Sequence, residues 1–279
     1  MNVAIIGTGL IGGSMALALK ELGIAKKIIG VDASEDHRKK AVDLGLVDET
    51  RELADAIIAS ELVIVAIPVH AAEKLLPAVM DQVTTQVVMD VSSTKETIIK
   101  SIAAHPKRKR FVATHPMWGT EYSGPEAAVR DAFKGKVTVI SGKEDCDPDA
   151  VSLVEDIYGK LGMKLIYMDP ESHDLHAAYV SHISHITSFA LANTVLEKEK
   201  EEDTIFAMAS AGFESTVRLA KSNPDMWVQI FLQNRENILD VLNEHITQLR
   251  KFKSCLEKEN ETYLTELIVN ANKIRKILK

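Results

Sequence analysis

Residues 2–22 read NVAIIGTGLIGGSMALALKEL: a short apolar run, a glycine-rich turn and a second apolar run. The first run predicts a buried strand, and the run after Ser14 predicts a helix. The turn between them has the GxGxxG spacing of a dinucleotide-binding loop. Its glycines allow a tight turn, a close approach of pyrophosphate to the backbone, and packing of the helix on the strand. The predicted cofactor-binding residues of this turn are Gly7, Gly9, Leu10, Ile11 and Gly12.

Asp32 supports this interpretation. A second apolar run, residues 27–31, ends at Asp32, where the acid that binds a ribose is expected in such a fold. Its carboxylate would accept hydrogen bonds from both ribose hydroxyls of NAD and repel the 2′-phosphate of NADP, so the sequence predicts NAD. Two alternatives stay open: Asp32 could cap a helix that begins near Ser34, and Arg38 is close enough in sequence to favour NADP.

Strands and helices continue to alternate beyond Asp32. This alternation predicts an α/β domain with a doubly wound parallel sheet of the Rossmann type, whose ligands bind beyond the carboxyl ends of the strands. We expect Pro68, Ser93 and His115 along that edge, with Pro68 in the cofactor site. Ser93 would equally suit the N-cap of a helix before Lys95. The further predicted strands are residues 61–67, 86–91, 111–113, 137–140 and 164–167.

The segment that follows the strand at residues 111–113 carries the candidate catalytic group. Residues 114–124 read THPMWGTEYSG. Pro116 disfavours a helical conformation for His115, and the two glycines permit turns, so the pattern predicts a loop that holds a titratable imidazole. A hydrogen-bonded structural histidine is the alternative to a catalytic one.

The strand pattern ends at about residue 169, and only helical periodicity follows. We therefore predict a dinucleotide-binding domain, residues 1–169, and an all-helical domain, residues 170–279, for substrate binding and dimerisation. Two amphipathic stripes, one from Phe231 to Leu256 and one from Leu264 to Ile277, predict two long helices. Few residues remain to cover these apolar faces, so we expect a second subunit to bury part of them in a homodimer.

Residues 175–200 predict a long helix with two histidines on adjoining parts of one face, His182 and His185. No carboxylate or cysteine nearby completes a set of metal ligands, so we predict no metal site. Farther on, Arg218 lies among apolar neighbours. Its guanidinium therefore needs an anionic ligand, bulk water or an internal acid as partner.

The composition excludes several classes of protein. A formal net charge of -7 over 279 residues, with both signs interspersed, argues against a nucleic-acid binder. No apolar run approaches the roughly 18 residues that a membrane span needs. Cys146 and Cys255 are far apart and form no ligand-spaced cluster, which fits a reduced, cytoplasmic setting.

Several motifs occur together in a fixed order: GxGxxG at residues 7–12, DVSSTK at 90–95, HPMWGTE at 115–121, SHISH at 181–185, and Arg218 followed by KSNPDMW at 221–227. In this order they resemble the prephenate/arogenate dehydrogenase family of tyrosine biosynthesis, and the resemblance covers nearly the whole chain. It implies NAD-dependent oxidative decarboxylation of prephenate to 4-hydroxyphenylpyruvate, or of arogenate to tyrosine.

The resemblance also implies roles for individual residues. His115 would be the general base that accepts the ring hydroxyl proton, and an imidazole of reference pKa about 6.5 is largely neutral at pH 7. Ser93 would orient that base or the hydroxyl, and Arg218 would bind the ring carboxylate. The residues implied to line the substrate pocket are Ser181, His182, His185, Trp227 and Glu121.

One position departs from the family pattern. In some relatives the acid at the position of Glu121 pairs with a lysine, but here that lysine position is Glu214. The choice between keto and amino side chains therefore stays open. We expect no regulatory module after the helical domain, so any inhibition by tyrosine would act at or near the active site.

Two rival functions stay open at this point. A β-hydroxyacid dehydrogenase or imine reductase would share the architecture but would not explain the His-Pro-Met-Trp-Gly segment. A catalytically silent NAD sensor would not require Ser93, His115 and Arg218 together.

Overall fold

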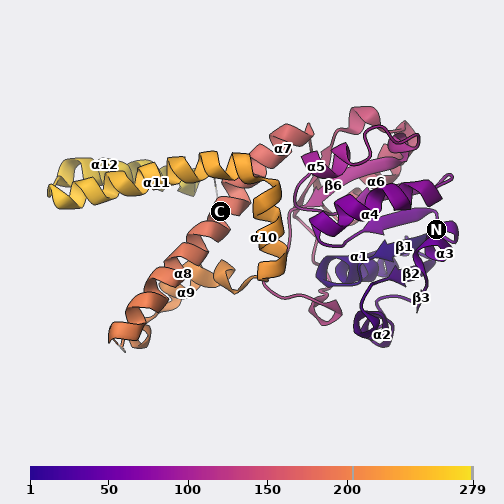
Figure 1. Ribbon diagram of the computed structural model, residues 1–279, viewed down its shortest axis with the longest axis horizontal. Helices are drawn as coiled ribbons and strands as arrows, with labels where there is room; N and C mark the ends of the chain where they lie inside the picture. The colour runs from indigo at the N-terminus through magenta and orange to yellow at the C-terminus, as the bar shows by residue number, and fades with distance from the viewer. Residues whose placement is uncertain (203, 278–279) are drawn as a thin grey trace. The chain divides into compact units, whose positions relative to one another are not determined.

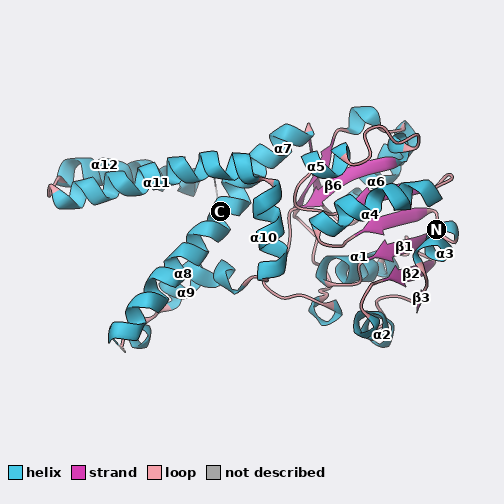
Figure 2. Ribbon diagram, viewed as in Figure 1, coloured by secondary structure: helices cyan, strands magenta, loops and turns pink. Residues whose placement is uncertain are grey.

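The computed structural model describes residues 1–202 and 204–277 (Figure 1 and Figure 2). They form two compact units, Met1–Asn234 and Arg235–Lys279. The first contains a sheet with helices on both faces, followed by helices only. The second is entirely helical in its described part.

The sheet has eight strands in the order β3-β2-β1-β4-β5-β6-β7-β8. The order starts at the centre with β1 and runs outward in both directions, as a doubly wound sheet requires. All neighbouring strands are parallel except β6 and β7. The strands are β1 (Asn2–Ile6), β2 (Lys27–Val31), β3 (Glu49–Thr50), β4 (Leu62–Val65), β5 (Val87–Asp90), β6 (Phe111–Pro116), β7 (Val137–Ser141) and β8 (Lys164–Met168).

The antiparallel pair corrects the prediction of a fully parallel sheet. Between β6 and β7 the chain forms a short 3-10 turn, Pro125–Ala127, and no α-helix. A parallel neighbour needs a crossover connection, usually a helix laid across the sheet. Without that helix the chain returns beside β6 in the opposite direction. Helix α6 (Pro148–Lys160) then restores parallel pairing between β7 and β8.

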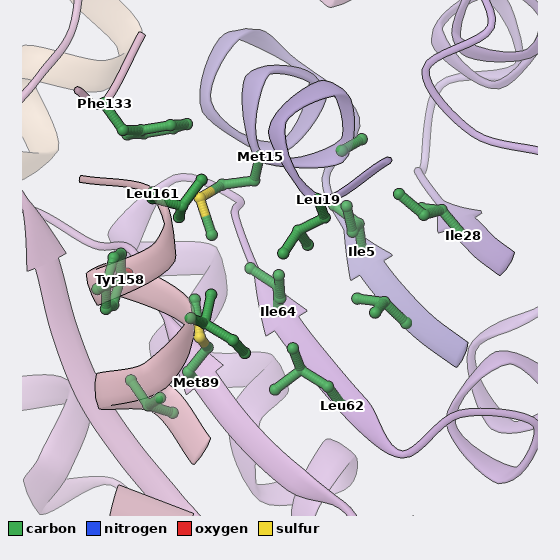
Figure 3. Close-up of a cluster of buried hydrophobic side chains, with 14 of the residues drawn as sticks. Ile5, Met15, Leu19, Ile28, Leu62, Ile64, Met89, Phe133, Tyr158 and Leu161 are labelled. Carbon is green, nitrogen blue, oxygen red and sulfur yellow. The ribbon is translucent and has the colours of Figure 1, made fainter. Parts of the chain in front are cut away.

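Alternate residues of the buried strands enter two separate cores. In β1, Ile5 faces the core beneath α1 (Leu10–Glu21), while Ile6 faces the core beneath α4 (Val69–Gln82). Figure 3 shows Met15 and Leu19 of α1 against Ile5 and its neighbours. Each buried aliphatic side chain of this size stabilises the fold by about 1.5–3 kcal/mol. Helices α1 (Leu10–Glu21), α2 (Glu35–Asp43) and α6 (Pro148–Lys160) pack on one face, and α3 (Leu53–Ile58), α4 (Val69–Gln82) and α5 (Glu96–Lys100) on the other.

The expected long helix at residues 175–200 is confirmed, with one irregularity. A π-helical turn, Ala178–His182, joins α7 (Pro170–Ala177) to α8 (Ile183–Glu202). Such turns insert an extra residue into the helix, shift the direction of the side chains around them, and are frequent at functional sites. The helices of this part are α7 (Pro170–Ala177), α8 (Ile183–Glu202), α9 (Ala211–Val217) and α10 (Pro224–Gln233).

The second unit contains α11 (Arg235–Glu257) and α12 (Glu261–Ala271), followed by a 3-10 turn, Asn272–Lys276. The predicted first stripe was wrong at its start, because Phe231 belongs to α10, which ends at Gln233. Large apolar side chains of these two helices remain exposed in the single chain. Among them are Leu249, Leu256 and Ile268.

Additional 3-10 turns are Arg108–Arg110, Lys143–Asp145, Phe206–Met208 and Arg218–Lys221. Among the described residues, each helix is either too short or too polar to cross a membrane.

Candidate active site

The glycine-rich loop, residues 7–12, connects β1 to α1 and has two kinds of glycine. A Cβ on Gly7, whose φ is 97°, would lie 2.4 Å from the Ala66 carbonyl oxygen, and one on Gly12 would lie 1.9 Å from the Gly7 carbonyl oxygen. These two positions therefore need glycine for backbone packing. A Cβ on Gly9 would meet only the Gly124 nitrogen, at 3.9 Å, so space remains beside that backbone.

The first turn of α1 starts at Leu10 and receives no hydrogen bond from an N-cap side chain, because the cap is Gly9. Its backbone N–H groups are therefore available to an anion. Leu10 and Ile11 are half-buried at this point. Open space beside Gly9 together with these N–H groups fits the pyrophosphate of a dinucleotide.

Asp32 lies directly beside the glycine-rich loop. Its Oδ2 accepts hydrogen bonds from the backbone nitrogen and the hydroxyl of Thr8, each at 3.0 Å. The alternative of a helix cap is wrong, because Ser34 is the N-cap of α2 and accepts from His37. Arg38 is also close, since its Nη1 donates to the Asp32 carbonyl oxygen at 2.6 Å.

Pro68 is exposed just beyond β4 and is the N-cap of α4. It lies at the same carboxyl edge of the sheet as the glycine-rich loop, because β1 and β4 are parallel neighbours.

His115 lies within β6, paired with Val139 of β7, rather than in the loop that the sequence predicted. Pairing with β7 extends the strand as far as Pro116. The imidazole is almost fully buried, and its Nδ1 is 2.9 Å from Nε2 of His173. The Nδ1 of His173 is in turn 2.7 Å from Oδ1 of Asp174. We call His115, His173, Asp174, His182 and Asn234 the histidine cluster.

Asp174 also holds the start of α5. Its two carboxylate oxygens accept hydrogen bonds from the backbone nitrogens of Lys95, at 2.7 Å, and Glu96, at 3.0 Å. The N-cap position of α5 is Lys95, so the alternative role of Ser93 as this cap is wrong. The half-buried Ser93 makes no hydrogen bond through its hydroxyl to any described residue, His115 included.

A buried ion pair supports the backbone immediately before His115. The ammonium of Lys95 pairs with Asp90 and donates to the Thr114 carbonyl oxygen at 2.7 Å, and both charged side chains are 0% exposed. Asp90 also accepts from the Thr114 nitrogen at 3.0 Å. Removing one partner of such a pair costs about 3–5 kcal/mol, because the other charge stays buried alone.

These surroundings keep the central imidazoles neutral. Burial is the main cause that lowers the pKa of His115 well below 6.5, and the neighbouring His173, Lys95 and His182 add to the effect. Burial also lowers the pKa of His173, although Asp174 opposes this shift. Both rings are therefore neutral at pH 7. No described residue makes a hydrogen bond to Nε2 of His115.

His182 is held on one side only. Asn234 donates from Nδ2 to the Asp174 carbonyl oxygen at 2.7 Å, which orients its amide, and lies 3.1 Å from Nδ1 of His182. Nε2 of His182 is buried and has no partner among the described residues. Burial lowers the pKa of this imidazole to about 4. His182 can therefore offer an unused N–H to a ligand.

An aromatic wall continues from His182. Its ring meets Trp227 edge-on, and His185 stacks on the same indole with ring centroids 3.4 Å apart. Nδ1 of His185 is 3.0 Å from the Ser181 carbonyl oxygen, which orients the ring. Burial lowers the pKa of His185, and the positive charge of Arg218 contributes to that shift.

Arg218 pairs with an internal acid, one of the partners considered from the sequence. Its Nη1 lies 3.4 Å from Oε2 of Glu121, and its side chain is 52% exposed. Glu121 is thus paired with Arg218, while Glu214 is exposed on α9. A guanidinium has five N–H donors, so most of them remain available to a second carboxylate.

The structure thus connects most of the predicted residues. Contacts or electrostatic interactions lead from His115 through His182 and Trp227 to His185 and Arg218. Ser93 is the exception, since nothing links its hydroxyl directly to His115. Sequence reasoning missed His173, Asp174, Lys95, Asp90 and Asn234 as parts of this site.

Only weak patterns in the sequence could have indicated these missed residues. A His-Asp pair follows the first turn of a helix, and a lysine follows the buried strand at 87–90. Within the described part of the chain, no group of three or more histidine, cysteine, aspartate or glutamate side chains could hold a metal ion.

Comparison with known proteins agrees over the whole chain. The model of the prephenate dehydrogenase nucleotide-binding domain matches residues 15–167, and that of the prephenate dehydrogenase dimerization domain matches residues 169–270. A cyclohexadienyl dehydrogenase of Zymomonas mobilis is 31% identical over 284 residues, which cover 100% of this chain and 96% of the relative. A prephenate dehydrogenase of Bacillus subtilis is 30% identical over 281 residues, 98% of this chain and 75% of the relative.

Solved structures lead to the same group of proteins. The crystal structure of prephenate dehydrogenase from Aquifex aeolicus in complex with hydroxyphenyl propionate and NAD+ has a TM-score of 0.92 and 31% identity. The match covers 100% of this chain and 98% of that one. The Synechocystis arogenate dehydrogenase shares the fold, with a TM-score of 0.79. The chain belongs to the prephenate dehydrogenase family.

Proposed function

We propose that this protein oxidatively decarboxylates prephenate to 4-hydroxyphenylpyruvate with NAD. The observation that carries the proposal is the neutral imidazole of His115, whose Nε2 has no partner among the described residues. It lies on β6, in the same parallel set of strands as the glycine-rich loop. Ligands of such a sheet bind at the carboxyl edge of its strands, so a substrate beside a bound dinucleotide would need its base at this edge.

The glycine-rich loop and Asp32 would hold the cofactor. The pyrophosphate fits the open backbone at Gly9 and the first turn of α1, and Asp32 would accept hydrogen bonds from the adenosine ribose. Pro68 would line the same site. When bound, NAD supplies the acceptor for the hydride of the carbinol carbon. The A. aeolicus relative crystallised with NAD+ supports this choice of cofactor.

His115 would hold the proton of the ring hydroxyl. As the hydride leaves the carbinol carbon, Nε2 takes this proton, and the electrons of the bond to the ring carboxylate move into the ring as carbon dioxide departs. The oxygen then recovers a proton as a phenol, so the step has no net proton loss. Ser93, half-buried after β5, would orient the hydroxyl.

Arg218 would bind the ring carboxylate with the donors that Glu121 leaves unused. This contact orients the substrate and does not assist decarboxylation, because stabilising the carboxylate opposes its loss. The unpartnered Nε2 of His182 would donate to an oxygen of the substrate. Ser181, His185 and Trp227 would form the wall around the substrate side chain.

The direct test is to incubate the protein with prephenate and NAD and to measure NADH together with 4-hydroxyphenylpyruvate. We expect both products in equal amounts. If no NADH forms with either prephenate or arogenate, the proposal is ruled out. NADP in place of NAD should give much lower kcat/KM, and a preference for NADP would contradict the role of Asp32.

Arogenate is a second candidate substrate, favoured by the position of Glu121. This carboxylate accompanies Arg218 and is only 18% exposed, so it could attract the amino group that distinguishes arogenate from prephenate. The variant Glu121→Gln should therefore lower kcat/KM for arogenate relative to that for prephenate. An unchanged ratio would remove this argument.

We also propose a homodimer in which the helical domain, residues 170–279, supplies the contacts and residues 1–169 bind the cofactor. The matched dimerization domain and the exposed apolar side chains of α11 and α12 support this proposal. A monomer by light scattering would contradict it. We expect tyrosine to compete with the substrate, because it has the hydroxyphenyl ring of the product and the side chain of arogenate. Non-competitive inhibition would mean that tyrosine binds at another site.

A further inference from the structure

Three side chains form a line of hydrogen bonds that ends at the proposed base. Asp174 lies 2.7 Å from His173, which lies 2.9 Å from His115. We infer that His173 and Asp174 are positioning residues that fix His115 with its proton on Nδ1 and its lone pair on Nε2. The inference rests on the proposed function only in naming His115 the base.

The direction of the first hydrogen bond follows from the other partners of Asp174. Backbone N–H groups can only donate, and two of them, from Lys95 and Glu96, point at its carboxylate oxygens. An ionised carboxylate accepts and does not donate. The hydrogen between Asp174 and His173 therefore belongs to Nδ1 of His173.

The second direction follows from the first. His173 is buried and neutral, so it carries a single ring proton. With that proton on Nδ1, its Nε2 is an acceptor. His115 must then donate from its own Nδ1. The opposite tautomer of His115 would bring two lone pairs together at 2.9 Å and would cover Nε2 with a proton, which leaves no basic atom for the substrate.

The charges around His115 make the carboxylate important during the reaction. The groups that act directly on this imidazole are His173 from α7, His182 from the π-helical turn, and Lys95 after β5. Asp174 lies one hydrogen bond farther away, bonded to His173. Lys95 opposes a positive charge on His115, although Asp90 is paired with it. Asp174 is the negative group connected to His115 through the hydrogen bonds, so it stabilises the ring when Nε2 holds the substrate proton.

His173 offers a matched pair of substitutions. The amide of asparagine reaches the place of an imidazole Nδ1, so His173→Asn can still bond Asp174 but loses His115. The longer glutamine reaches the place of Nε2, so His173→Gln can still accept from His115 but loses Asp174. Asp174 is less suited to a comparison of kcat values, because it also holds the backbone of α5.

The first measurement is the tautomer itself. In protein with 15N-labelled imidazoles, long-range 1H–15N NMR assigns the protonated nitrogen of each histidine. For the wild type and His173→Gln we expect His115 protonated on Nδ1, and for His173→Asn a mixture of both tautomers. A wild-type His115 protonated on Nε2 would overturn the inference without any variant.

The second measurement is kinetic. With prephenate and NAD, His173→Asn should lower kcat by about 100-fold, and His173→Gln by less than about tenfold, with KM for NAD unchanged in both. A merely structural His173 would give equal losses of kcat in the two variants, or a rise in KM with kcat preserved. Either result would overturn the inference.

A third readout is the pH profile of kcat/KM for Asp174→Asn. Loss of the carboxylate charge disfavours protonated His115, so the acidic limb should move to lower pH. If the acidic limb of the kcat/KM profile stays at the same pH, Asp174 has no part in stabilising protonated His115. These failures differ from failure of the proposed function, in which the wild type makes no NADH from prephenate or arogenate while the tautomer of His115 is still as inferred.

Discussion

The glycine-rich loop packs against residues 5–32 and against the backbone of Ala66, just beyond β4. The histidine cluster, in contrast, takes its side chains from β6, α7, the π-helical turn and the end of α10. In the loop, backbone atoms pack against backbone atoms, and a single added methyl group at Gly12 would meet an oxygen at 1.9 Å. In the cluster, side chains meet side chains, and each ring is held by hydrogen bonds to another segment.

This difference separates two ways of making a site. A loop made from backbone depends on the conformation of a few consecutive residues, so it tolerates little change at its glycines and is insensitive to protonation. A cluster of buried imidazoles depends on which nitrogen carries a proton, so its function and its stability both vary with pH. Four substitutions or conditions separate the two regions experimentally, with effects that decrease in the order given.

The largest effect is expected from His115→Asn. The asparagine amide can still donate to His173, so the cluster should stay folded, but no base remains at the position of Nε2. We expect kcat with prephenate to fall about 1,000-fold. NAD affinity, measured by fluorescence titration, should not change, because the glycine-rich loop is untouched. A variant with wild-type kcat would exclude His115 as the base.

Gly12→Ala should disrupt the backbone of the loop, whereas His115→Asn leaves the fold of the cluster intact. The new Cβ would overlap the Gly7 carbonyl oxygen, and we expect a loss of about 3 kcal/mol in the free energy of unfolding, or failure to fold. Gly9→Ala is the matched control, because its Cβ would have open space. Its free energy of unfolding should stay within about 1 kcal/mol of wild type while NAD binding weakens. Equal losses of the free energy of unfolding in Gly12→Ala and Gly9→Ala would contradict the claim that only Gly12 is needed for backbone packing.

Acid should weaken the cluster and leave the loop intact. The pKa of His182 is about 4 in the folded protein and 6.5 as its ordinary value, so the unfolded chain binds a proton that the folded chain does not. Stability is therefore complete above about pH 6.5 and falls as the pH decreases toward 4. The shifts of His115, His173 and His185 have the same sign.

From pH 7 to pH 5, urea unfolding should show a loss of about 2 kcal/mol from His182 alone. The carboxylates with lowered pKa values do not titrate in this range. In His182→Gln the decrease between the two pH values should be smaller than in the wild type. A free energy of unfolding that is constant from pH 7 to 5 would contradict the buried, neutral state of these imidazoles.

The smallest effect is expected at the exposed edge of the site. Arg218→Ala should raise KM for prephenate about tenfold and leave kcat nearly unchanged, since a half-exposed guanidinium contributes binding more than catalysis. Lys221→Ala, three residues on, removes the same charge without the contact to Glu121 and should leave KM nearly unchanged. A fall in kcat with unchanged KM would mean that Arg218 acts in the chemical step.

Much of the fold followed from the sequence because its patterns are local. Short apolar runs predicted β1, β2, β4, β5, β7 and β8, and the long helix around His182 was predicted within a few residues. The errors, the antiparallel pairing of β6 with β7 among them, concern events that local patterns do not record. Pairing with β7 kept His115 inside a strand, and the helix expected from Phe231 onward breaks at Asn234, which faces His182 and Asp174.

By itself, the sequence determined the nucleotide-binding loop, the order of strands and helices, and the set of candidate residues, because the conformations that create these features depend on neighbours along the chain. Only the tertiary structure determined which partners each polar group has. It paired Arg218 with Glu121, showed that Asp174 rather than Ser93 accepts the first backbone hydrogen bonds of α5, and placed His173 between Asp174 and His115. Hydrogen bonds of this kind join segments far apart in the sequence, so spacing and residue type carry almost no record of them.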